Sequence, residues 1–143
     1  MTGHRKLHAS SAMLWGGLLA LSLMGVDRSF GAPASGLARS HSGGGVTVTV
    51  TYLNPQGMED ARFQIVLDTH TVNLDNYYLK NLSLLHDDKG QMYQPKEIET
   101  KGAGHHREIT LIFPKPAPDA KRLDLVIKEI AGVEKRSFRW ELP

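Results

Sequence analysis

The residues of this chain best suited to chemistry are histidines and one aspartate. Beyond position 34 the sequence holds five histidines, two of them adjacent at His105 and His106, and Asp68 stands two positions before His70. Cysteine is absent, so a transition-metal site would have to use imidazole together with carboxylate or thioether groups. Asp68, His70, His105 and His106 could together supply three imidazoles and a carboxylate to Cu²⁺ or Zn²⁺.

A structural role for the same residues is the favoured interpretation. Neighbouring residues of a strand point to opposite faces, so His105 and His106 reach one ion only if the glycines at 102 and 104 draw them out of the ladder. The imidazoles would otherwise bond loop backbone, and Asp68 would orient a ring or bind turn amides. The sequence therefore favours a histidine latch without a cofactor over a copper or zinc site.

The stretch Ala61–Asp75 must position Asp68 and His70. Its apolar residues alternate up to Leu67 and then resume with changed parity at Val72, which predicts a bulge or break on Asp68–His70. If this strand is antiparallel to the one holding Ile109–Phe113, the end of the first coincides with the start of the second. All three histidines should then lie at one end of the sheet.

Alternating strands separated by turn signals extend through the rest of the chain, with no sustained helical period. Val46–Tyr52 is the clearest strand, and Asp87–Gly90 and Ala131–Gly132 are typical of hairpin turns. The pattern predicts an all-β domain over 46–143, a two-sheet antiparallel immunoglobulin-like sandwich of seven to eight strands. A small closed barrel is the alternative.

The first 34 residues are typical of a secretory signal peptide. A polar, basic start precedes a 14-residue apolar run, Met13–Val26, and Ala32-Pro33-Ala34 supplies a cleavage site after Ala34. Because about 20 residues are needed to cross a bilayer as a helix, we expect cleavage and no stable membrane insertion afterwards. The alternative is an uncleaved anchor. Residues 35–45, rich in serine and glycine, are predicted to be a flexible linker.

Removal of residues 1–34 would leave 14 basic and 14 acidic residues, a formally neutral protein. Neutrality disfavours nucleic acid as a partner, since nucleic-acid-binding domains carry a basic excess. The chain also lacks a G-x-S-x-G nucleophile elbow, a phosphate loop and any thiol nucleophile. We therefore expect a protein that is not an enzyme.

Three segments, Leu67–His70, Gly104–Arg107 and Phe138–Trp140, resemble segments of short exported bacterial proteins of uncharacterised function with a single immunoglobulin-like domain. The resemblance covers roughly Val46–Leu142 and implies a free-standing exported domain. The expected function is a periplasmic or secreted module that binds another exported or envelope protein. The alternative is a periplasmic copper- or zinc-binding protein, and the sequence leaves the oligomeric state open.

Overall fold

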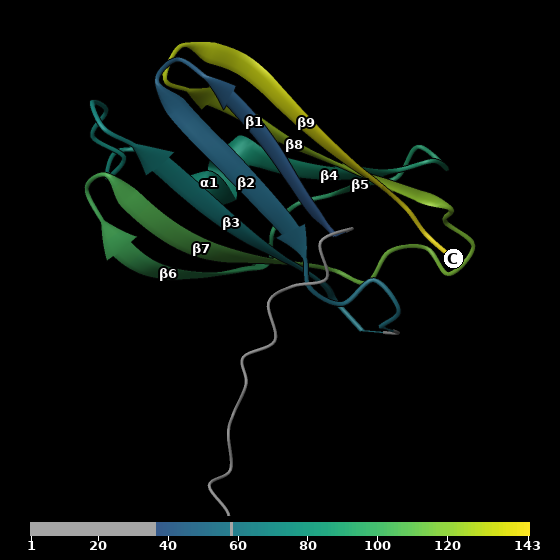
Figure 1. Cartoon of the computed structure of the whole chain (residues 1–143). Coiled ribbons are helices and arrows are strands. Elements are labelled where there is room, and N and C mark those ends of the chain that lie inside the picture. The colour runs from purple at the N-terminus through teal and green to yellow at the C-terminus, as the bar shows by residue number, and fades with distance from the viewer. Residues whose placement is uncertain (1–36, 58) are drawn as a thin grey trace, which may run out of the picture. The chain divides into compact units, whose positions relative to one another are not determined.

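The computed structural model describes residues 37–57 and 59–143, and the predicted signal peptide lies outside these residues. The described part forms two antiparallel sheets and one short helix (Figure 1). The first sheet has the order β1–β2–β3–β7–β6, with bounds Ala38–Gly43, Val46–Tyr52, Ala61–Thr69, His106–Phe113 and Glu97–Ala103. The second has the order β5–β4–β8–β9, with bounds Met92–Tyr93, Ser83–Asp87, Arg122–Ile130 and Val133–Glu141. Helix α1 spans Leu79–Leu82.

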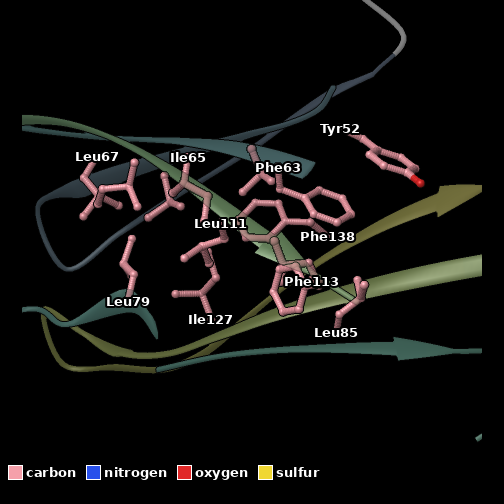
Figure 2. Close-up of a cluster of buried hydrophobic side chains, with 14 of the residues drawn as sticks. Tyr52, Phe63, Ile65, Leu67, Leu79, Leu85, Leu111, Phe113, Ile127 and Phe138 are labelled. Atoms are coloured by element: carbon pink, nitrogen blue, oxygen red, sulfur yellow. The ribbon is translucent and has the colours of Figure 1, made fainter. Parts of the chain in front are cut away.

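The core lies between the two sheets. Every second residue of β2 and β3 is buried, as their alternation predicts, and these side chains meet apolar residues of β4, β8 and β9. Figure 2 shows Phe63 and Leu111 from the first sheet among Leu85, Ile127 and Phe138 from the second. The predicted all-β, two-sheet architecture is therefore confirmed, with nine strands in the described residues instead of seven to eight.

The segment predicted to be a flexible linker contains a strand. Residues 38–43 form β1, which pairs with β2 along its whole length, from Ala38 opposite Thr51 to Gly43 opposite Val46. Gly44 and Gly45 make the connecting turn, both with positive φ, which suits the tight turns that join antiparallel strands. A serine- and glycine-rich segment lacks the apolar alternation by which a strand is recognised in a sequence. Residues 38–43 form a strand because their backbone pairs with the neighbouring β2.

Two further segments differ from their predicted structure. The leucine-rich sequence of Tyr78–His86 predicts a single strand, but this segment is a turn of helix followed by β4, because Leu79 enters the core from α1 rather than from an extended chain. The sequence around Ile98 predicts only a weak strand fragment, whereas the structure has the seven-residue strand β6, which reaches Ala103. Pro95 predicts that the strand after Gly90 is short and lies at an edge, and β5 is a two-residue edge strand. Gly90 has positive φ in the predicted turn before it.

The parity change after Leu67 does not fall where the sequence predicts it. Strand β3 continues without a bulge to Thr69, which is buried like Leu67, and its register with β2 and β7 is unbroken. The hydroxyl of Thr69 donates to the Gly45 carbonyl at 2.6 Å, so an inward polar residue is satisfied there. The change of parity therefore occurs in the loop after the strand has ended.

Candidate functional site

The end of β3 and the start of β7 bring Asp68 and His106 together. The two residues are directly opposite in the antiparallel ladder, and His106 Nδ1 lies 3.1 Å from Asp68 Oδ1. The side chains of His106 and Asp68 are 61% and 62% exposed. The carboxylate can only accept a hydrogen bond, so Nδ1 of His106 is the donor and Nε2 faces away from the pair. An exposed pair of this kind stabilises the fold by about 1 kcal/mol at most.

His105 lies in the turn between β6 and β7 and is also tied to a loop. Its Nδ1 lies 3.2 Å from the Val72 carbonyl, which can only accept, so this ring also donates through Nδ1. The backbone carbonyl of His105 accepts from the amide of Thr69 at 3.1 Å. His105 thus connects the turn to the loop that follows β3.

The third predicted histidine, His70, follows the last residue of β3 and is exposed. The Thr69–His105 backbone bond puts it at the same end of the sheet as His105 and His106, but no hydrogen bond to its ring occurs within the described residues. In the part of the chain that the structure describes, no group of three or more His, Asp or Glu side chains is arranged to hold a metal ion.

We call this end of the sheet, formed by the loop 70–78 and the turn Gly104–His105, the histidine end. Its loop is held mainly by groups other than the predicted histidines and Asp68. The amide of Gly104 donates to Asp75 Oδ1 at 2.9 Å, and its carbonyl accepts from Leu74 N at 3.0 Å. Arg107 donates to the carbonyls of Leu74 and Tyr77, the second at 3.0 Å. The loop is therefore fixed at several points, of which the His105 ring is only one.

A second candidate site is the outer edge of β6. All seven residues of this strand are exposed, although one side of its backbone is paired with β7. Ile98, with 37% of its surface exposed, is one of the few large apolar residues in the described chain that remain accessible. The sequence predicts only a weak strand fragment here, because an edge strand that is exposed on both faces shows no apolar alternation.

A groove of about 200 Å³ with a mixed polar and apolar lining lies at the other end of the domain from the histidines. Tyr52, Pro116 and Leu142 contribute apolar surface to its walls, and Gln56 and Lys115 contribute polar surface. The sequence of Pro114–Pro118 indicates no more than a stiff connector. The groove is large enough for one small apolar group.

Comparison of the chain with protein-family models, curated proteins and solved structures found no match. Within the described residues, helix α1 is too short to cross a membrane, and no longer apolar helix occurs there.

Proposed function

We propose that this chain is an exported, non-enzymatic module with an immunoglobulin-like fold that binds another exported or envelope protein. The strand order supports the immunoglobulin-like topology. In the order of neighbours within each sheet, β2, β3, β7 and β6 correspond to strands A, B, E and D of that fold, and β4, β8 and β9 correspond to C, F and G. Strand β5 then takes the place of an additional strand beside C, and β1 extends the first sheet.

The open edge of β6 is the observation that carries the binding proposal. An exposed strand edge offers a row of backbone donors and acceptors to an extended segment of another protein. Ile98 adds accessible apolar surface, and the start of the strand is fastened to helix α1 by a hydrogen bond from Lys80 Nζ to the Lys96 carbonyl at 3.1 Å. The edge is therefore held in place at its start and is open along its length.

Export rests on the sequence of residues 1–34, which is typical of a signal peptide, and assigns the protein to the periplasm or the extracellular space. The neutral mature chain supports a protein partner rather than nucleic acid. A short exported domain of this kind would act as an accessory subunit or a binding module.

In-cell photo-crosslinking tests this function. A photoreactive residue in place of Ile98 should give one discrete adduct with a partner, whereas the same residue in place of Lys128, exposed on β8, should give none. The adduct should disappear in the Thr100→Pro variant, since proline removes a backbone donor from the strand edge. An adduct of equal yield at both positions, or none at Ile98, would contradict binding through β6.

Metal binding is a second candidate function, favoured by the Asp68–His106 contact. A carboxylate that accepts from Nδ1 of a histidine leaves Nε2 available to a metal ion and makes the ring a better ligand. Copper or zinc would then bind through His106 Nε2, with His105 or His70 recruited from the same end of the sheet. Equilibrium dialysis against micromolar Cu²⁺ and Zn²⁺ should give one ion per chain, and binding should fall in His106→Ala but not in His86→Ala, in the other sheet. Absence of stoichiometric binding would remove this function.

A further inference from the structure

Strand β6 is the long sheet edge that the described residues leave open. The edges at β1 and β9 lie against each other and are joined by side chains: Trp140 Nε1 donates to the Leu37 carbonyl at 2.7 Å, and Arg39 Nε donates to the Arg139 carbonyl at 3.2 Å. In Figure 1 these two strands run side by side, while β6 lies at the far edge of its sheet. The remaining edge, β5, is only two residues long.

The direction of the free backbone groups follows from the ladder. The amide of Thr69 donates to the carbonyl of His105, so the odd-numbered residues of β7 direct their backbone groups toward β3. The even-numbered residues of β7 therefore face β6, where they are opposite Glu97, Glu99 and Lys101. The backbone groups of the alternate residues Ile98 and Thr100 consequently point away from the sheet, toward any strand that adds to it.

The charges of β6 are self-complementary. Glu97, Glu99 and Lys101 share the outer face of the sheet, and Arg62 lies 3.5 Å from Glu99 on that face. Lys101 makes no ion pair within residues 37–57 and 59–143. An antiparallel copy of the same strand, centred on Thr100, would put Lys101 of each copy directly opposite Glu99 of the other, with no like charges facing each other.

We propose that β6 pairs with β6 of a second copy of this chain, antiparallel and about a two-fold axis through Thr100. The pairing would join the two five-stranded sheets into one continuous sheet and cover both open edges at once. Two Glu99–Lys101 pairs fix the register, and Ile98 of each copy lies opposite Gly102 of the other. This inference rests on the proposed binding role of β6, and it identifies the exported protein bound there as a second copy of this chain.

Sedimentation equilibrium of the purified protein, from micromolar concentration up to its solubility limit, tests the pairing. The unchanged protein should form a dimer. Lys101→Glu and Glu99→Lys should each weaken dimerisation at least about tenfold, because every attractive cross-strand pair becomes repulsive in both halves of the interface. An equimolar mixture of these two variants should form a heterodimer, since the glutamates of one chain then face the lysines of the other at both pairs. Lys128→Glu, with the same change of charge on the other sheet, should dimerise like the unchanged protein.

Thr100→Pro is a second, independent test, because it removes a backbone amide that points away from the sheet and leaves the hydrogen bonds to β7 intact. Circular dichroism should show it folded, and sedimentation should show it monomeric. A dimer that survives both Thr100→Pro and Lys101→Glu would overturn the proposal, as would a protein that stays monomeric at every concentration. If the protein is monomeric, a crosslinked adduct at Ile98 with a mass other than twice that of this chain would still support the binding of a partner through β6. Failure of the dimer proposal can therefore be distinguished from failure of the proposed binding function.

Discussion

Arg136, on β9, donates a hydrogen bond from Nη2 to the backbone carbonyl of Gly43 on β1 at 2.7 Å, across 93 positions of sequence. Its Nη1 donates to the carbonyl of Ile130 at 2.9 Å, and the residue is 1% exposed. Within the described residues Nε has no partner, and burial lowers the pKa of the guanidinium. One buried cation thus connects the turns of two hairpins that belong to different sheets.

Replacement of Arg136 by alanine should lower the free energy of unfolding by about 2–4 kcal/mol, because the carbonyls of the buried Ile130 and the half-buried Gly43 lose their donor and a cavity is left. Urea unfolding followed by tryptophan fluorescence measures this. The neighbouring exposed Lys135→Ala should change the free energy by less than about 0.5 kcal/mol. Equal effects of the two substitutions would show that the Arg136 contacts do not stabilise the fold.

The turns beside Arg136 offer a matched pair of glycines. Gly44 and Gly132 have φ of 63° and 73°, but a Cβ on Gly44 would lie 2.0 Å from the Ala131 carbonyl oxygen, whereas one on Gly132 would meet nothing within 4 Å. Gly132→Ala should therefore lower the free energy of unfolding by about 1–2 kcal/mol, because alanine is strained there only by the left-handed backbone conformation. Gly44→Ala should lower the free energy of unfolding, measured with urea, by at least about 1 kcal/mol more, since the turn must also shift. A larger loss for Gly132→Ala would contradict this close approach of the two turns.

Asp87 makes the stability of the β4–β5 hairpin dependent on pH. Desolvation acts to raise the pKa of this buried carboxyl, but hydrogen bonds from the Tyr93 hydroxyl and from the amides of Gln91 and Lys89 outweigh it, and the pKa is lowered. Its contribution is therefore present above about pH 4, the value for the unfolded chain, and is lost as pH falls through the lower folded value.

Substitution Asp87→Asn should accordingly lower the free energy of unfolding by about 1–3 kcal/mol at pH 7. The difference from the unchanged protein should shrink as the pH falls from about 4 through the lower folded value, because the native carboxyl then becomes protonated as well. Urea unfolding at a series of pH values measures both. Glu134→Gln, at an exposed position on β9, is the control, and its stability difference from the unchanged protein should not depend on pH in this way. If Asp87→Asn remains less stable than the unchanged protein at low pH, the charge of the Asp87 carboxylate is not responsible for the difference.

Export predicts a mature chain that begins at Ser35. Intact mass of the protein from the cell envelope or medium should correspond to residues 35–143, because the small residues at Ala32 and Ala34 suit cleavage after Ala34. An Ala34→Lys variant should accumulate as the uncleaved precursor. Recovery of the full-length chain from membranes with the native sequence would instead support the retained anchor.

Much of the fold can be predicted from the sequence because its signals are local. Strict alternation marks Val46–Tyr52, and the positive φ of Gly90 and Gly132 lies at the predicted turns. The antiparallel pairing of β3 with β7 is one arrangement that two alternating strands allow, and it brings Asp68 opposite His106. Period and turn chemistry are properties of neighbouring residues, so they can be recognised before any tertiary contact is known.

Only the tertiary structure decided which polar segments have partners. Strand β1 forms although its sequence lacks apolar alternation, because β2 and the β9 edge offer it hydrogen bonds. The charged Arg136 is buried because the carbonyl of the distant Gly43 meets its guanidinium beside that of Ile130 in its own hairpin. The histidine end is held by Arg107 and Asp75, whose acceptor and donor lie about 30 positions away in the chain. Such partners depend on how the sheets pack and connect, and no local pattern encodes that.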